Sequence, residues 1–375
     1  MTAAPTDTGL RGTQTLGAFT GGQLRRLGAV AGLSEADVET YARVLTDSLG
    51  PVAERPLNLP PPSRTFVSDD HTPVEFSLSF QPDAAPALRV LLDPGCGADS
   101  LARGGRVGLE AIRAMAWRWN FTTGPLDDLA DLFLPPSPQG ALALWCALEL
   151  RPGGVPKVKV YLNPAANGAE RSAGTVREAL HRLGHRQAFD NLPQGSGYPF
   201  LALDLGDWEQ PRAKVYVRHD DLTAGQAGRL SRMSPGPGPA AIEGFFRTAA
   251  GLGPDVTGLS GRPGLSCHSF TDTATARPSG FTLHIPVRDY AGHDGEALAR
   301  AASVLRHHGM DASALVRALA AVTDRRPEDG VGLIAYLALA HQQDRPPRVT
   351  AYLSSEAYAV RPPVVKAVRH PVAVP

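Results

Sequence analysis

Two segments, KVKVYLNP at residues 157–164 and RAKVYVRH at residues 212–219, share the pattern that determines the predicted fold. In each segment a lysine and a tyrosine two positions later alternate with apolar residues, so one face is polar and the other apolar. A period of two indicates β-strands, because successive side chains of a strand point to opposite faces. The two segments are therefore predicted to be equivalent strands of one sheet.

Strands of this kind recur in pairs along the chain, and each pair follows segments whose apolar residues have helical spacing. The predicted strand pairs are 73–80 with 87–93, 141–150 with 156–162, 199–205 with 211–219, 265–272 with 280–287, and 331–340 with 347–354. The predicted helical segments are 22–48, 102–119 with 126–133, 173–190, 240–251, and 294–322. Short connections that contain Pro or Gly indicate that the strands of a pair are antiparallel.

Five helix–helix–strand–strand repeats favour an α+β fold whose ten antiparallel strands close into one barrel. Closure removes the exposed edges of a sheet, helices cover the outside, and ten strands leave a lumen wide enough for a ligand. An open α+β sheet is the alternative. We expect a single domain over residues 16–360, with poorly ordered tails at residues 1–15 and 361–375.

The composition excludes several classes of partner. The 375 residues include 37 basic and 37 acidic side chains, whereas proteins that bind nucleic acid normally have a basic excess. No apolar run approaches the ~18 residues of a membrane-spanning helix, and the segment MTAAPTDTGL lacks the features of a signal peptide. Three cysteines without a CxxC pair are typical of reduced thiols. We expect a cytoplasmic monomer or homodimer with no nucleic-acid, membrane or metal partner.

Lysine is rare, and its positions are informative. Only four of the 37 basic residues are lysines, and Lys157, Lys159 and Lys214 lie on the polar faces of the two segments quoted above. If helices cover the apolar faces, the polar faces line the lumen with cations and tyrosines, and Glu75 is the one carboxylate that faces the cationic set. Close cations repel by about 4 kcal/mol per pair at an effective dielectric constant of about 20, so we expect an anion among them.

A diphosphate is the anion that this combination of residues favours. Lysine supplies a point charge, and arginine supplies a bidentate fork for phosphate oxygens. The faces of neighbouring tyrosines stabilise a carbocation, by ~2 kcal/mol or more each where water is excluded. Buried cations, an anion and aromatic walls together indicate ionisation of an allylic diphosphate.

Two other features have more ordinary interpretations. Asp127-Asp128-Leu129-Ala130-Asp131 matches DDxxD, the magnesium–diphosphate motif of all-helical terpenoid enzymes. This chain has no clear second acidic motif and too many strands for that class, and the helix dipole alone favours acidic residues early in a helix. His71 precedes the strand that contains Glu75, and we predict a turn there, with the cavity mouth as the alternative.

Six segments, taken in their order and spacing, resemble the dimethylallyltryptophan synthase family. They are TPVEFSLSF (72–80), LRVLLDP (88–94), KVKVYLNPAANG (157–168), RAKVYVRH (212–219), FTLHIPVRDY (281–290) and PRVTAYLSSEAY (347–358). Members of this family are aromatic prenyltransferases with an ααββ barrel, the prenyltransferase barrel. The resemblance extends over roughly residues 20–360 and is greatest to actinobacterial tryptophan 6-dimethylallyltransferases.

The resemblance implies roles for individual residues. Glu75 corresponds to the carboxylate that holds the indole N–H. Thr282 and His284 occupy the positions where fungal members have a Gln-x-Tyr pair. This difference leaves that side of the tyrosine shield incomplete and gives His284 a different catalytic role. Trp119, Trp145 and Trp208 are expected to pack in the core rather than against a substrate. The implied diphosphate ligands are Arg89, Lys159, Arg212, Lys214 and Arg348, and the implied shield of the dimethylallyl cation is Tyr161, Tyr216 and Tyr352.

The reaction implied by the resemblance is transfer of a dimethylallyl group from dimethylallyl diphosphate to the indole of L-tryptophan, at carbon 6, in secondary metabolism such as alkaloid biosynthesis. No metal or other cofactor is implied, since the protein's own cations neutralise the leaving group. Glu75, His284 and the diphosphate are all candidates for the final base. The alternatives are another ring position, another indole or hydroxyaromatic acceptor, and a non-catalytic barrel that binds an anionic aromatic ligand.

Overall fold

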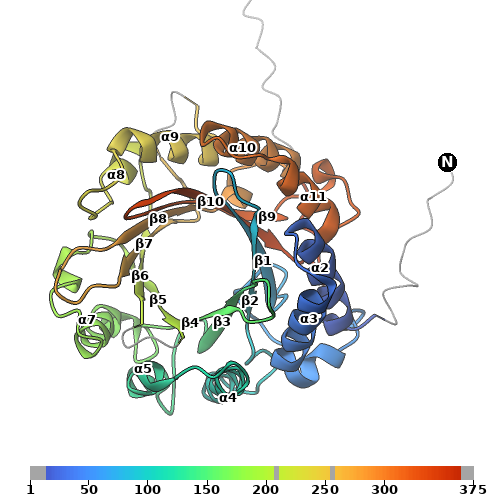
Figure 1. Ribbon diagram of the computed structural model, residues 1–375, viewed down its shortest axis with the longest axis horizontal. Helices are drawn as coiled ribbons and strands as arrows, with labels where there is room; N and C mark the ends of the chain where they lie inside the picture. The colour runs from blue at the N-terminus through green and yellow to red at the C-terminus, as the bar shows by residue number, and fades with distance from the viewer. Residues whose placement is uncertain (1–13, 207–210, 254–257, 365–375) are drawn as a thin grey trace, which may run out of the picture.

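The computed structural model describes residues 14–206, 211–253 and 258–364, and its centre is a closed barrel of antiparallel strands (Figure 1). Every strand pairs with its neighbours in sequence, and β1 closes the ring by pairing with β10, with Glu75 opposite Ser354. The strands are β1 (Val74–Phe80), β2 (Ala87–Leu92), β3 (Leu144–Glu149), β4 (Lys157–Leu162), β5 (Gly197–Leu205), β6 (Ala213–His219), β7 (Gly264–Phe270), β8 (Gly280–Ile285), β9 (Ile334–Gln342) and β10 (Arg345–Ser354).

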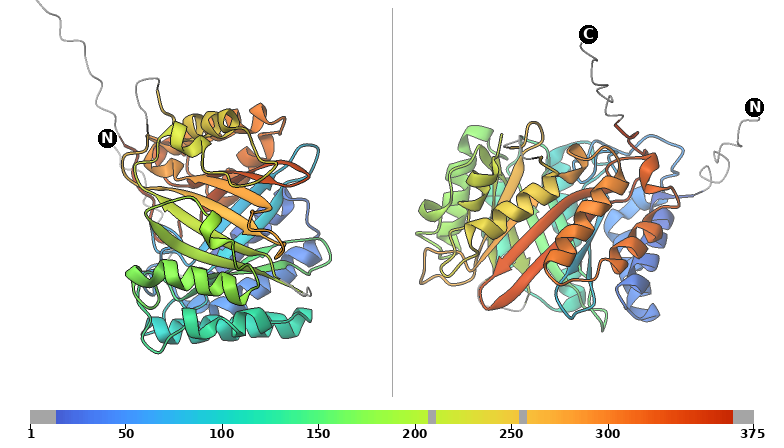
Figure 2. Two further views of the ribbon diagram at one scale, coloured as in Figure 1. Left: turned by 90° about the vertical axis from the view of Figure 1, so that its left-hand side faces the viewer. Right: turned by 90° about the horizontal axis from the view of Figure 1, so that it is seen from above.

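Helices surround the barrel and leave its two ends uncovered (Figures 1 and 2). Within the described ranges, none of them is both long enough and apolar enough to span a membrane. The helices are α2 (Leu16–Val30), α3 (Glu35–Leu49), α4 (Leu101–Trp119), α5 (Gly124–Asp127), α6 (Ala130–Phe133), α7 (Ser172–Arg182), α8 (Ala224–Gly228), α9 (Pro239–Ala250), α10 (Asp294–His307) and α11 (Ser313–Val322).

The predicted α+β barrel is confirmed. All ten predicted strands are present, and their ends agree with the prediction to within three residues. The closed order of the strands rules out the open sheet that the sequence left as an alternative.

The predicted helices are less continuous than expected. The segment predicted as one helix over residues 22–48 is two helices, because the chain turns at Gly32 with a φ of 72° and Ser34 then caps α3 by accepting a hydrogen bond from the Asp37 N–H. The segment 294–322 is divided in the same way at Gly309, which has a φ of 69°. Each break folds a long apolar stripe into a helix pair that follows the curved barrel wall.

The apolar core lies between the barrel and the helices. Outward-facing side chains of the strands, such as Val158, Val160 and Leu162 on β4, are at most 2% exposed. Helix α4 approaches β3 closely at Gly108, where a Cβ atom would lie 2.9 Å from a methyl carbon of Leu144. Because the helices bury the apolar faces of the strands, the polar faces are left to line the lumen.

Most of the tail residues predicted to be poorly ordered, namely 1–13 and 365–375, lie outside the described residues. The innermost tail residues have defined contacts. Thr15 caps α2 by accepting a hydrogen bond from the Ala18 N–H, and the Arg361 carbonyl accepts a hydrogen bond from the Val331 N–H.

Candidate active site in the barrel lumen

The barrel brings together in its lumen all ten residues singled out from the sequence. The strand register explains this, because Ser77 lies between Arg89 on β2 and Tyr352 on β10, and all three side chains face inward. The ten residues that line the lumen are Glu75, Arg89, Lys159, Tyr161, Arg212, Lys214, Tyr216, His284, Arg348 and Tyr352.

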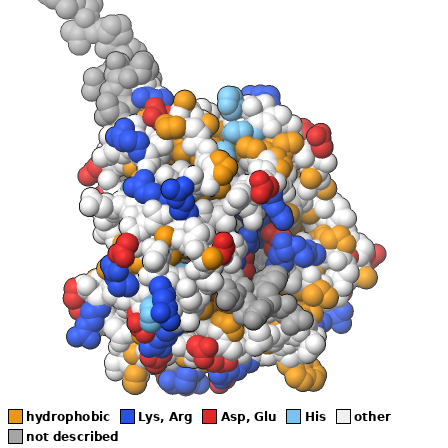
Figure 3. All heavy atoms as spheres, turned by 60° about the vertical axis from the view of Figure 1, so that its left-hand side comes forward, with side chains coloured by type: hydrophobic (Ala, Val, Ile, Leu, Met, Phe, Trp, Pro, Cys, Tyr) orange, Lys and Arg blue, Asp and Glu red, His pale blue; other side chains and the backbone are white. Residues whose placement is uncertain are grey.

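The lumen has an aromatic part and a cationic part. At one end lies a cavity of about 370 Å³ that is rich in aromatic side chains, and it narrows into a recess of about 60 Å³ that contains Arg89, Lys159, Lys214 and Arg348. The two spaces are continuous, because six residues line both of them. A third space of about 50 Å³, beside Arg212, extends toward the β-hairpin turns. Figure 3 shows a hollow with Lys and Arg side chains gathered around it.

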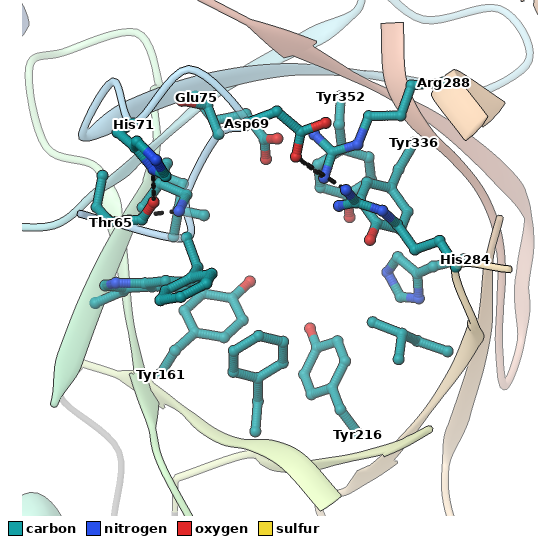
Figure 4. A pocket seen from close by; sticks show the side chains of 18 residues that line it. Thr65, Asp69, His71, Glu75, Tyr161, Tyr216, His284, Arg288, Tyr336 and Tyr352 are labelled. Carbon is teal, nitrogen blue, oxygen red and sulfur yellow. Dashed lines mark hydrogen bonds and ion pairs between the residues drawn. The ribbon is translucent and has the colours of Figure 1, made fainter. Parts of the chain in front are cut away.

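Aromatic rings line much of the wall of the larger cavity (Figure 4). Tyr161 and Tyr216 have ring centroids 5.9 Å apart, and Phe200 contacts both edge-on at 6.0 and 5.7 Å. On the opposite side, Tyr352 meets Tyr336 edge-on at 6.3 Å. A cation held in this cavity therefore faces several electron-rich rings.

His284 fills the gap that the sequence led us to expect in this wall. Its ring lies 5.7 Å from that of Tyr216 and 5.9 Å from that of Tyr352, so it joins the two tyrosines. Burial lowers the pKa of His284 to about 3, and the nearby lysines contribute. The imidazole is therefore neutral and weakly basic at physiological pH.

Two carboxylates that face the lumen, buried Asp204 and half-buried Glu149, were not identified from the sequence. Asp204 on β5 lies 3.5 Å from the Lys159 Nζ and 4.0 Å from the Lys214 Nζ, and it accepts a hydrogen bond of 2.6 Å from the Arg212 Nε. Glu149 on β3 accepts bonds of 3.0 and 2.8 Å from Arg89. The expectation that Glu75 is the only carboxylate facing the cationic set is therefore wrong, because β3 and β5 each contribute one.

These ion pairs change the charge state of the cations unequally. Burial is the largest influence on Lys159 and opposes its charge, but Asp204 and Tyr161 together outweigh burial and leave the pKa of Lys159 above its ordinary value. Burial dominates at Lys214 and holds its pKa well below the ordinary value. Arg348 makes no ion pair with any described residue, and burial lowers its pKa to about 10, so it stays charged at neutral pH. An unpaired buried cation of this kind favours an anionic ligand.

Glu75 stands in the wall between the aromatic and cationic parts. It is 6% exposed, and it makes no hydrogen bond or ion pair with any described residue. Burial raises its pKa to about 8, with Arg288 opposing and Asp69 reinforcing the shift. An unpartnered carboxyl in a wall of this kind accepts a hydrogen bond from a ligand N–H or O–H.

Loop residues around the aromatic cavity form a second charged group that was not identified from the sequence. Asp69 Oδ1 lies 3.0 Å from Arg262 and 3.1 Å from Arg288 (Figure 4). Arg288 is 3% exposed, its guanidinium lies 5.1 Å from the Tyr336 ring centroid, and its Nη1 has no hydrogen-bond partner among the described residues. His71, for which a turn was predicted, adopts a φ of 63° and also lines the cavity.

The remaining sequence features lie as follows. Trp145 lines the cavity, where a core position was expected, whereas Trp119 on α4 packs against the core as predicted. Trp208 lies outside the described residues. In the DDxxD segment, Asp127 pairs with Arg113 at 2.7 Å and Asp131 with Arg182 at 2.6 Å on the outer helices, away from the lumen.

Signals for the two unexpected carboxylates were present in the sequence. Asp204 in FLALDL (200–205) and Glu149 in LWCALEL (144–150) are single acids within apolar strands, where burial without a partner is costly. No set of three or more His, Cys, Asp and Glu side chains in the described part of the chain is arranged to hold a metal ion.

Known proteins match both the sequence and the fold. The sequence model of the tryptophan dimethylallyltransferase family matches residues 32–233, more than half of the chain. The chain belongs to this family, which makes it an aromatic prenyltransferase, as the sequence indicated.

Several solved structures superimpose over nearly the whole chain. The 5-dimethylallyl tryptophan synthase from Streptomyces coelicolor, solved with DMASPP and Trp, is 77% identical, with a TM-score of 0.91 over 96% of this chain and 100% of its own. The prenyltransferase PriB, solved with L-tryptophan and dimethylallyl thiolodiphosphate, is 65% identical, with a TM-score of 0.92 over 94% and 99%. The 6-dimethylallyltryptophan synthase from Micromonospora olivasterospora is 38% identical, with a TM-score of 0.85 over 93% and 99%.

Proposed function

We propose that this protein transfers a dimethylallyl group from dimethylallyl diphosphate to the indole ring of L-tryptophan and releases diphosphate. The observation that carries the proposal is the junction of the two parts of the lumen, where a cationic recess with an unpaired arginine opens into an aromatic chamber beside a free carboxyl. The relatives solved with DMASPP and Trp support the same pair of substrates.

The cationic recess is proposed to bind the diphosphate of the donor. Arg348 supplies an unpaired charge, and Arg89, Lys159, Arg212 and Lys214 supply charges that their carboxylate partners only partly neutralise. These cations stabilise the negative charge that develops on the leaving group as the C–O bond breaks. The proposal needs no metal ion, because the protein itself supplies the positive charge.

The aromatic chamber is proposed to hold the dimethylallyl cation and the acceptor. Tyr161, Tyr216 and Tyr352 surround the space above the recess, and Tyr336 extends the same wall. Glu75 accepts the indole N–H and raises the electron density of the ring. The indole carbon then attacks the cation, a C–C bond forms, and the ring proton leaves to restore aromaticity. The weak basicity of His284 favours the released diphosphate as the acceptor of that proton.

The charged group at the cavity favours a free amino acid as the acceptor. The unpartnered Nη1 of Arg288 suits an α-carboxylate, and Asp69 suits an α-ammonium group. Arg288→Met should raise the KM for L-tryptophan at least tenfold, since a hydrogen bond to a charged group contributes about 1.5–3 kcal/mol. The KM for tryptamine, which lacks the carboxylate, should be unchanged. Equal effects on both acceptors would assign Arg288 a purely structural role.

For the ring position, we propose carbon 5. The relative at 77% identity is a 5-dimethylallyl tryptophan synthase, whereas the 6-dimethylallyltryptophan synthase is 38% identical. Carbon 6, expected from the sequence resemblance, is the competing outcome. Both positions belong to the benzene half of the indole, so the two outcomes differ only in a small rotation of the acceptor.

Product analysis tests the function directly. The protein is incubated with dimethylallyl diphosphate and L-tryptophan, with and without a chelator, and the product is examined by mass spectrometry and NMR. We expect tryptophan plus one C5 unit, substituted at carbon 5, in equal yield with chelator. Loss of product with chelator would overturn the metal-independent mechanism, and absence of product with any indole would favour a non-catalytic carrier.

A further inference from the structure

We propose that Asp204 is a positioning residue of the diphosphate site, which keeps Lys159 protonated and holds Lys159 and Lys214 aimed at one point before the donor binds. This inference rests on the proposed diphosphate-binding role of the recess. Asp204 itself faces the same recess but, as an anion, cannot bind the diphosphate.

The geometry places Asp204 at the centre of three cations. It lies on β5 between β4 and β6, in register with Lys159, and its two oxygens reach Lys159, Lys214 and Arg212. Asp204 is 6% exposed and Lys214 is 8% exposed, so little water screens these charges. Three cations this close repel one another, and the one carboxylate among them offsets that repulsion.

The consequence of losing this carboxylate differs between lysine and arginine. A buried lysine that loses its counter-ion gives up its proton near neutral pH, whereas arginine remains charged. Without Asp204, Lys159 is therefore neutral in the empty protein and must take up a proton when the donor diphosphate binds, whereas burial already opposes the charge on Lys214 in the wild type.

Among the residues that the structure describes, the other groups with shifted pKa values that face this site do not exchange protons in the same range. Arg89 on β2 and Arg348 on β10 remain charged. Burial raises the pKa of Cys267 on β7, and burial and neighbouring groups raise the pKa of Tyr216, so both stay neutral. His284 on β8 is already neutral. Glu75 titrates at about pH 8 but is present in wild type and variant alike, so its contribution cancels in their comparison.

Glu149 provides a matched control. It is also a carboxylate that faces the lumen, although it is only half-buried, and its closest partner is an arginine, with Lys157 3.4 Å away on a side chain that is 41% exposed. Glu149→Gln therefore disturbs the recess without leaving a buried lysine unpaired. Any effect that arises only from lysine protonation should appear with Asp204→Asn and not with Glu149→Gln.

The direct experiment measures proton uptake on binding. Dimethylallyl thiolodiphosphate, the sulfur analogue of the donor, is titrated into each protein by calorimetry at pH 8 in buffers of different ionisation enthalpy. On binding the analogue, Asp204→Asn should take up as much as one proton more than wild type does. It should also bind the analogue at least tenfold more weakly than wild type. Its affinity relative to wild type should recover by up to about tenfold per pH unit as the pH is lowered toward 6, as proton linkage requires.

The outcomes separate positioning from structure. Asp204→Glu should restore part of the affinity and abolish the extra proton uptake, and thermal melting establishes that each variant is folded. Proton uptake equal to wild type in a folded Asp204→Asn protein, or a loss of affinity that does not change with pH, would overturn the inference. If wild type binds the analogue but forms no product with tryptophan, the proposed function fails while the inference about Asp204 stands.

Discussion

The raised pKa of Glu75 gives a quantitative test of its role. If the carboxylate form holds the indole N–H, activity must increase as Glu75 ionises. With a pKa of about 8, about one-tenth of the protein carries the carboxylate at pH 7 and about nine-tenths at pH 9. The kcat/KM for tryptophan should therefore rise about tenfold over this interval through Glu75 alone.

Glu75→Gln isolates this contribution because it keeps the shape and removes the charge. A hydrogen bond to a charged acceptor contributes about 1.5–3 kcal/mol, so the variant should lose about 10- to 150-fold in kcat/KM at pH 9. The measured quantity is the ratio of the wild-type kcat/KM to the variant kcat/KM across pH 6–9. Taking the ratio removes effects that are common to both proteins. We expect this ratio to rise with pH and to level off above pH 9.

An acceptor without an N–H supplies the control. With 1-methyltryptophan, wild type and Glu75→Gln should behave alike at every pH. A ratio that stays flat or falls with pH for tryptophan itself, or a rise that persists with 1-methyltryptophan, would refute the assignment of Glu75 to the indole N–H.

Three further predictions concern neighbouring groups. Lys159→Ala and Lys214→Ala should each lower turnover by ~10²–10³. The amine of Lys157 is partly exposed, so turnover of Lys157→Ala should stay close to that of wild type. Unchanged turnover in both lumen variants would contradict the diphosphate site. The ratio of the wild-type kcat/KM to that of His284→Gln should be constant between pH 5 and 9, because the pKa of His284 is about 3. A change in this ratio centred near pH 6.5 would show a titrating imidazole. Burial raises the pKa of Glu75 from 4.5 to about 8, so ionisation of Glu75 destabilises the folded state increasingly as the pH rises between these values. Glu75→Gln should therefore raise the free energy of unfolding at pH 7 by up to about 3 kcal/mol, and with it the melting temperature, with no gain near pH 4.

The strand pattern of the sequence predicted the barrel because polar and apolar residues alternate with a period of two in several of its strands. Segments 157–162 and 213–219 show this directly, and the apolar faces identified there are the buried ones. The helix pairs were predicted as single helices because apolar spacing continues across the breaks. Gly32 and Gly309 turn the chain with positive φ, and a glycine inside a periodic segment does not by itself distinguish a turn from a tolerated helix position.

Alternation also predicted which residues of the polar strand faces line the lumen. It did not identify lumen residues on strands that have no polar face in the sequence. Tyr336 and Asp204 lie in strands that are otherwise nearly all apolar, so they did not stand out as members of a polar face. Asp69, Arg262 and Arg288 come from loops and a short turn that have no periodicity. Their meeting depends on how the loops pack over the barrel end, which local sequence does not encode.

The closing pair of the barrel joins the two ends of the domain. The Thr350 hydroxyl on β10 donates to the Ser79 hydroxyl on β1 across 271 residues of sequence. Glu75 and Tyr352, from opposite ends of the chain, therefore reach a common lumen only after the last strand has been synthesised and released from the ribosome. Contacts this distant in sequence form slowly, and a truncated chain that lacks β10 has no enclosed chamber. The chamber proposed to hold the carbocation therefore exists only once β10 has closed the barrel.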